Sequence, residues 1–273
     1  MPVSVKPMFL DGENGRIFAL HFCPEMDSIR AHIVFLPPFA EEMNRCRHLA
    51  ADQARRFATM GFSCLIIDPF GTGDSEGELA QSSWKGWHAD AMTGVQWCQQ
   101  QQHLPVILWG LRLGALLALD LAAKRTDQFS SLLLWQPVTN GKTFLTQILR
   151  ARIAYLSGME MTPETTGEMR SRLEGGENIE VAGYVLGGTL AKDIDNLSVS
   201  ALTGLSGANI HWLQQASASA EGPSSGVQKV VDQLISQDNK VDVTLFQSPQ
   251  IWQLSERADC RQLLDKTSAI QLL

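Results

Sequence analysis

Arg112 is the centre of the segment Gly110-Leu111-Arg112-Leu113-Gly114, which follows an apolar run over residues 106–109 and precedes another over residues 114–124. The first run predicts a central strand and the second a buried helix, so we expect Arg112 at the tip of a sharp turn that ends the strand. A guanidinium group stays protonated at any accessible pH and has no lone pair to offer. The residue type therefore predicts ion pairing or anion binding at this tip and excludes nucleophilic attack.

Acidic and thiol groups follow the predicted strand at residues 32–36. Glu41 and Glu42 lie in the loop after it, where a carboxylate can pair with Arg112 or act as an acid or base. Cys46 comes soon afterwards, at a spacing that matches the apolar face of a helix, which predicts a buried thiol of low reactivity. His48 is the one histidine that we keep as a site candidate.

The elements that position these residues are predicted from the apolar pattern. Two β-rich runs at residues 3–10 and 16–22 flank a turn rich in Gly and Asn and predict an antiparallel hairpin. Six later runs are apolar on both faces and alternate with helical segments, which predicts a parallel sheet covered on both sides. These runs are residues 32–36, 62–67, 106–109, 131–135, 210–213 and 241–246.

Helices and an insertion complete the predicted architecture. Helices are predicted over residues 44–60, 84–101, 114–124 and 227–236. Between residues 140 and 207 the alternation stops: residues 144–156 and 162–173 predict helices, and residues 179–186 a strand. We therefore predict one α/β core of residues 1–139 and 208–273, with residues 140–207 inserted as a lid over the carboxyl ends of the strands.

The composition narrows the classes of partner. The 273 residues are 44% hydrophobic, enough for a full core, and the formal charge of −7 without any Lys/Arg-rich run argues against nucleic acid and anionic membranes. Five cysteines are scattered without metal-ligand spacing, and the third glycine after Gly71-Thr72-Gly73 comes one residue late for a dinucleotide motif. We expect no metal and no cofactor. Residues 1–10 lack a signal pattern and no apolar run is long enough to span a membrane, so we expect a cytoplasmic protein.

Three segments together resemble the α/β-hydrolase superfamily. Residues 35–42 resemble the strand and loop that supply one oxyanion donor, residues 68–77 are similar to its Asp-x-x-Gly-x-Gly-x-Ser turn, and residues 110–114 occupy the place of its Gly-x-Ser-x-Gly nucleophile elbow. Within the superfamily, the runs Pro-Pro-Phe-Ala-Glu-Glu-Met-Asn, Gly-Leu-Arg-Leu-Gly-Ala and Leu-Trp-Gln-Pro-Val resemble the second type of hydrolase-like protein that accompanies bacterial exosortase systems. That resemblance implies a link to exopolysaccharide production and to protein sorting at the envelope.

The catalytic triad of that fold has no match at any of its three places. The triad runs Ser, then Asp or Glu, then His along the chain. Here the elbow tip is Arg112, residues 214–220 contain no acid, and residues 247–253 contain no histidine. The last histidine of the chain is His211. We therefore predict that serine-hydrolase activity is lost.

The remaining frame predicts a binding site at the elbow. The amides of Phe39 and Leu113 are expected to converge there, and with Arg112 they would form an anion site unless Glu41 or Glu42 pairs with the arginine. The internal pair is favoured because an unpaired arginine in a covered cleft is costly to desolvate. Two tryptophans, Trp135 and Trp252, are expected to wall an apolar cleft at the same edge of the sheet.

Two functions fit these residues. The first is a protein without serine-hydrolase activity that binds a small anionic or acyl ligand, or a protein partner, with Phe39, Glu41, Arg112, Leu113, Trp135 and Trp252 as the binding residues. The second is an active hydrolase of esters or thioesters that uses groups outside the triad, with Glu41, Glu42 and Cys46 as candidates. The sequence does not select an oligomeric state.

Overall fold

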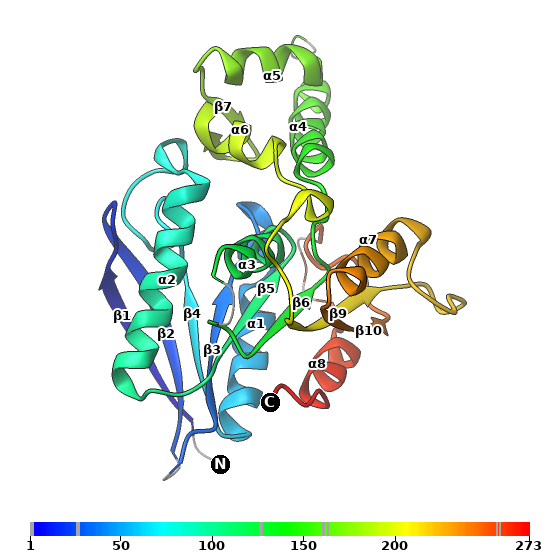
Figure 1. Cartoon of the computed structure of the whole chain (residues 1–273). Helices are drawn as coiled ribbons and strands as arrows, with labels where there is room; N and C mark the ends of the chain where they lie inside the picture. Colours follow the sequence, from blue (N-terminus) through cyan, green and yellow to red (C-terminus); the bar gives the residue numbers. More distant parts are fainter. Residues whose placement is uncertain are drawn as a thin grey trace.

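The computed structural model describes residues 3–25, 28–125, 128–159, 162, 164–254, 256 and 258–273. Eight strands form one sheet in the order β1-β2-β4-β3-β5-β6-β9-β10 (Figure 1). β1 pairs antiparallel with β2, β2 pairs antiparallel with β4, and the other neighbouring pairs are parallel. The strands are β1 (Val3–Asp11), β2 (Arg16–Pro24), β3 (Ala31–Leu36), β4 (Phe62–Ile67), β5 (Val106–Leu111), β6 (Ser131–Trp135), β9 (Asn209–Gln215) and β10 (Lys240–Phe246). The predicted hairpin and mostly parallel sheet are confirmed.

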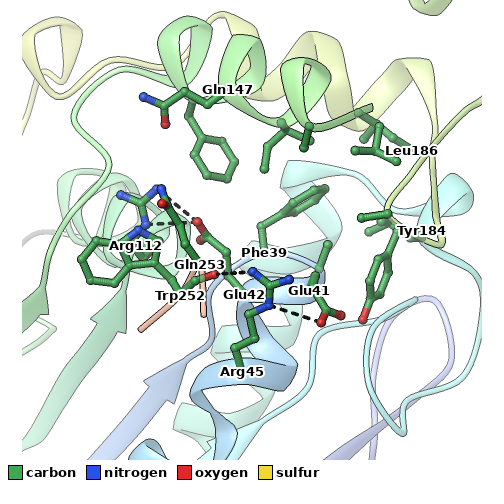
Figure 2. A pocket seen from close by; sticks show the side chains of 17 residues that line it. Phe39, Glu41, Glu42, Arg45, Arg112, Gln147, Tyr184, Leu186, Trp252 and Gln253 are labelled. Atoms are coloured by element: carbon green, nitrogen blue, oxygen red, sulfur yellow. Dashed lines mark hydrogen bonds and ion pairs between the residues drawn. The ribbon is translucent and has the colours of Figure 1, made fainter. Parts of the chain in front are cut away.

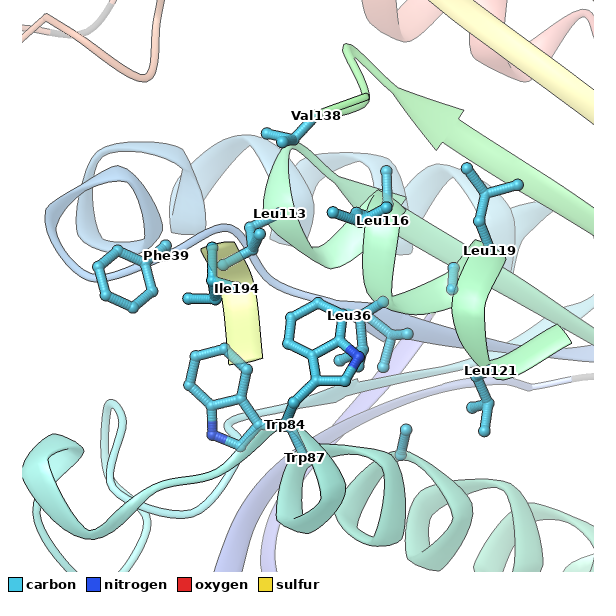
Figure 3. Packing of buried hydrophobic residues seen from close by; sticks show 14 of the residues in the cluster. Leu36, Phe39, Trp84, Trp87, Leu113, Leu116, Leu119, Leu121, Val138 and Ile194 are labelled. Carbon is cyan, nitrogen blue, oxygen red and sulfur yellow. The ribbon is translucent and has the colours of Figure 1, made fainter. Parts of the chain in front are cut away.

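Helices cover both faces of this sheet because side chains alternate along each strand. In β3, Val34 and Leu36 belong to the hydrophobic cluster that includes α2 and α3, whereas Ile33 and Phe35 belong to the cluster that includes α1 and α8. Figure 3 shows the first of these layers, where side chains of α2 and α3 meet Leu36. The helices of the two layers are α1 (Glu41–Thr59) and α8 (Arg261–Ser268) on one face, and α2 (Trp84–Gln101), α3 (Leu113–Lys124) and α7 (Ser225–Ser236) on the other.

Residues 140–207 lie between β6 and β9 in the sequence and are called the inserted segment below. Its elements are α4 (Gly141–Gly158), α5 (Thr166–Glu174), β7 (Ile179–Val181), β8 (Tyr184–Leu186), α6 (Gly188–Asp195) and the 3₁₀ turn η2 (Val199–Ala201). Helices α4, α5 and α6 lie at the top of Figure 1, whereas η2 contacts α3 and α7. Side-chain hydrogen bonds cap the N-termini of two of the helices. The side chain of Asn140 accepts a hydrogen bond from the amide of Thr143 at the start of α4, and Thr165 and Glu168 form a capping box at the start of α5.

Several predicted boundaries are wrong. The predicted strand at residues 179–186 is a hairpin, because Ala182 (φ 51°) and Gly183 (φ 84°) turn the chain between β7 and β8. The helix predicted from residue 162 begins at Thr166. Neither α6 nor α8 was predicted, nor was the 3₁₀ turn η1 (Leu79–Gln81). Within the described residues, no helix combines the length and apolar character that crossing a membrane requires.

Candidate functional site

The strained turn at Arg112 carries the site. Arg112 is the N-cap residue of α3 and has φ 56° and ψ −114°, a backbone conformation that residues other than glycine rarely adopt. The flanking glycines make the turn possible. A carbon built at the Cβ position of Gly114 would lie 2.1 Å from the carbonyl oxygen of Leu36, and one on Gly110 would lie 2.4 Å from the Cα of Ala115. The sequence therefore keeps a tight strand–turn–helix junction with a cationic side chain at its tip.

A second junction of the same kind lies beside the first. Ala40 caps α1 with φ 50° and ψ −123°. The strand before it, β3, pairs with β5, so the two turns leave neighbouring strands at the same edge of the sheet. Glu41 and Glu42 were predicted to lie in a loop, but they are the first two residues of α1. Their carboxylates offset the positive end of the helix dipole.

Arg112 forms an ion pair with Glu42 (Figure 2). Its Nε and Nη2 atoms lie 3.2 and 3.1 Å from Oε1 of Glu42, and each side chain is only 12% exposed. The other oxygen, Oε2 of Glu42, is buried and has no hydrogen-bond partner in the described part of the chain. Burial raises the pKa of Glu42, and the charge of Arg112 offsets part of that rise. The elbow tip is thus occupied by an internal, largely desolvated pair.

Two aromatic rings flank the guanidinium group of Arg112. Its central carbon lies 5.0 Å from the ring centre of Trp252, which follows β10, and 5.8 Å from that of Phe144 on α4. Both distances are typical of cation–π contacts. Arg112 therefore joins three separate parts of the chain: α1 through Glu42, the segment after β10, and the inserted segment through α4.

A second polar group lies beside this pair. Arg45 pairs with Glu41 at 3.3 Å and also donates to the carbonyl oxygen of Trp252 at 3.4 Å. Asn44 donates from its side-chain amide to the hydroxyl oxygen of Tyr184 at 2.6 Å. Since Tyr184 begins β8, this bond fastens the β7–β8 hairpin to α1.

These groups surround a cavity of about 320 Å³. The inserted segment supplies one side of it and the sheet edge the other (Figure 2). The lining residues are Phe39, Ala40, Glu41, Glu42, Arg45, Leu79, Arg112, Phe144, Gln147, Ile148, Ala151, Val181, Ala182, Tyr184, Leu186, Trp252 and Gln253. None of these described lining residues is a serine, threonine, cysteine or histidine. The walls are mainly apolar, and the size lies within the range of small-molecule sites.

The family of the chain follows from comparison with known proteins. Residues 27–173, just over half of the chain, match the protein family described as Serine aminopeptidase, S33, which has the α/β-hydrolase fold. The chain belongs to this family. A comparison with curated protein sequences gives no match.

Solved structures of other α/β hydrolases share the fold. Est1E from Butyrivibrio proteoclasticus with bound ferulic acid has a TM-score of 0.61 at 12% identity, over 96% of this chain and 94% of that one. A carboxyl esterase from Bacillus coagulans has a TM-score of 0.62 at 14% identity, over 98% and 96%. A putative hydrolase from Agrobacterium vitis has a TM-score of 0.55 at 20% identity, over 92% and 95%. At these identities the likeness concerns the fold alone.

In this α/β hydrolase, five of the residues singled out from the sequence lie together. Phe39, Glu41, Glu42, Arg112 and Trp252 all line the cavity. They come from two strand–turn–helix junctions and from the segment after the last strand, which is the arrangement predicted for the carboxyl edge of the sheet.

Three other candidates lie elsewhere. Leu113 is buried and lines a narrower cavity next to Phe39, so only its backbone amide remains a candidate. Cys46 is 1% exposed on the inner face of α1, and burial, reinforced by Glu42, raises the pKa of its thiol far above the ordinary value. Trp135 was expected in the cleft, and this expectation is wrong: its fully buried ring packs on Trp109 and donates to Thr267 of α8.

The places predicted for the acid and the histidine hold a glutamine network. Gln214 donates to the side chain of Gln136 at 3.0 Å, and the side-chain amide of Gln215 bonds to the carbonyl oxygen of Ser248. His211 is buried within β9 and does not line the cavity. His48, the one histidine kept as a site candidate, does not line the cavity either.

Sequence reasoning missed several lining residues. Arg45 stands four residues after Glu41, a spacing that predicts an ion pair on a helix and was available as a signal. Phe144, Gln147 and Tyr184 belong to the inserted segment. No local pattern indicates which of their side chains face the core, because that depends on how the segment packs.

Proposed function

We propose that this α/β hydrolase binds a small acyl ligand in the cavity between the elbow and the inserted segment, and that it does so without serine-hydrolase catalysis. The observation that carries the proposal is the buried pair of Arg112 with Glu42 at the elbow tip. A protonated guanidinium group cannot form an acyl-enzyme, and its ion pair fills the space beside the turn.

The triad is proposed to be lost rather than rearranged. The lining residues of the described chain offer no serine, cysteine or histidine that a substrate in the cavity can reach. Removal of a catalytic nucleophile costs roughly 10⁶ in rate where it has been measured. Ester turnover through a relay of the ordinary kind is therefore expected to be undetectable.

The setting of the proposal rests on the sequence resemblance. We propose that residues 140–207 act as a lid, supported by the contribution of Phe144 and Tyr184 to the cavity wall. The likeness of the elbow region to hydrolase-like proteins of exosortase systems supports a role in exopolysaccharide production. All five cysteines are free, which supports a reducing compartment such as the cytoplasm.

Hydrolysis of a panel of p-nitrophenyl esters from two to twelve carbons tests this function. The expected result is no turnover above buffer for the natural chain, and none for Arg112→Ser, since a serine there has no base. Saturable quenching of Trp252 fluorescence by a non-hydrolysable acyl amide is expected in the same preparation, with Trp252→Phe as the control for the probe. Robust turnover of any ester contradicts the proposal.

A second candidate function is hydrolysis of esters or thioesters through Glu42. Its support is the raised pKa of this carboxyl group and its position on the cavity wall, properties that suit a general base. If ester turnover is found, this candidate predicts its loss in Glu42→Gln and its retention in Glu41→Gln. Turnover that survives Glu42→Gln excludes it.

A further inference from the structure

The charges on the cavity wall cancel one another. Arg112 pairs with Glu42, and Arg45 pairs with Glu41, so the four ionised side chains among the described lining residues carry no net charge. The two carboxylates also lie in the first turn of α1, where they offset that helix's dipole.

From this arrangement we infer that the ligand of the cavity is an uncharged acyl compound, such as an ester or amide, and not a carboxylate or a phosphate. The inference rests on the proposed binding function and adds the charge class of the ligand. It differs from the expectation drawn from Arg112 alone, which favoured an anion.

An anion could bind Arg112 with the Arg112–Glu42 pair intact or with the pair broken, and both states are unfavourable. If the pair is intact, the anion lies beside the Glu42 carboxylate, whose Oε1 already accepts two of the guanidinium hydrogen bonds. If the anion displaces Glu42 from Arg112, the Glu42 carboxylate is buried without a cation unless it takes up a proton. The aromatic rings of Trp252 and Phe144 on the guanidinium group further restrict the approach.

An uncharged amphiphile matches the remaining lining groups of the cavity, which include apolar side chains and two side-chain amides. Apolar side chains such as Phe39, Ile148 and Leu186 can cover an acyl chain. The side-chain amides of Gln147 and Gln253 line the cavity. They can donate to a carbonyl oxygen or accept from an amide or hydroxyl group of the ligand.

Isothermal titration with three ten-carbon probes tests the inference at pH 7.5, with the charged probes below their critical micelle concentrations and the neutral probe below its solubility limit. The probes are decanamide, decanoate and decyltrimethylammonium. Decanamide is expected to bind the full-length chain at least tenfold more tightly than either charged probe.

Substitution of the pair sharpens the test. Glu42→Gln leaves Arg112 without its anion and is expected to raise the ratio of decanoate affinity to decanamide affinity at least tenfold. The double variant Arg112→Gln/Glu42→Gln is expected to restore the preference for decanamide. Decanoate binding as tightly as decanamide to the natural chain overturns the inference, whether or not the variants fold.

Two further variants separate failure of the inference from failure of the binding function. Ala151 and Ala154 are both exposed on α4, but only Ala151 lines the cavity. Ala151→Trp is expected to abolish decanamide binding and Ala154→Trp to leave it unchanged. If no probe binds, or if Ala151→Trp has no effect on binding, the proposed site itself is wrong.

Discussion

Removal of Glu42 is the perturbation that tests the ion pair most sharply. In Glu42→Ala the guanidinium group of Arg112 stays between Trp252 and Phe144 with no anion beside it. Loss of one partner from a buried pair typically costs 3–5 kcal/mol. Because the Arg112 side chain retains 12% exposure, we expect about 3 kcal/mol, at the low end of that range.

A neighbouring pair supplies the matched control. Glu41 and Arg45 are 39% and 26% exposed and lie 3.3 Å apart, so water screens their attraction. Glu41→Ala is expected to cost less than about 1 kcal/mol. Arg112→Ala is expected to cost about 1–2 kcal/mol, because Glu42 can take up a proton when its cation is removed, given its raised pKa.

Urea unfolding followed by far-ultraviolet circular dichroism measures these costs. The double variant Glu42→Ala/Arg112→Ala closes a thermodynamic cycle, and we expect a coupling energy of about 2 kcal/mol. A cost for Glu42→Ala no larger than that for Glu41→Ala, or a coupling below about 0.5 kcal/mol, would refute the reasoning that the pair is desolvated and mutually dependent.

Three further predictions concern other parts of the molecule. Burial raises the pKa of Asp90 to about 6, with Glu13 adding to the rise and the amide of Phe70 opposing it, so the folded state binds a proton more tightly than the unfolded state. Stability should therefore fall as pH rises from about 4 to about 6. Asp90→Asn should remove this pH dependence and should be about 2–3 kcal/mol more stable than the natural chain at pH 7.5. Thermal unfolding across this pH range measures both effects, and an unchanged pH dependence in the variant contradicts the assignment. Gly114→Ala should cost more than about 3 kcal/mol because its Cβ would overlap the carbonyl oxygen of Leu36; a cost near that of an exposed Gly→Ala change in a denaturant titration argues against the tight turn. Tyr184→Phe removes the acceptor of the Asn44 amide and should speed hydrogen exchange in β7 and β8 while changing global stability by about 1 kcal/mol or less, and protection that stays the same shows that the bond does not hold the hairpin.

Strands and core helices followed closely from the sequence. β4, β6 and α2 have the predicted bounds because a continuous apolar run or a strong helical period marks each of them. By contrast α8 is mostly polar and buries only Leu263, Leu264 and Thr267, too few apolar positions to reveal a helix in advance. The hairpin at residues 179–186 has its turn at Ala182-Gly183, and the alanine concealed the turn since it is not a usual residue at positive φ.

The position of a site residue was predictable where the residue directly follows a strand of the parallel sheet. Arg112, Glu42 and Trp252 follow strands whose carboxyl ends share one edge, so their meeting could be expected. The prediction that Trp135 lines the cleft was wrong, and the sequence contained the reason. Side chains alternate along β6, and Trp135 shares the face of Leu133, toward α1 and α8 and away from the cavity. The partners Phe144 and Tyr184 depend on the packing of the inserted segment and were not accessible from local pattern.

Covalent labelling is the most direct test of the claim that the elbow carries no nucleophile. The full-length chain is incubated with a reactive fluorophosphonate, and its intact mass is measured against a serine esterase treated in parallel. We predict no mass increase in this chain under conditions that label the esterase completely. A stoichiometric adduct that maps to a residue lining the cavity would contradict the account.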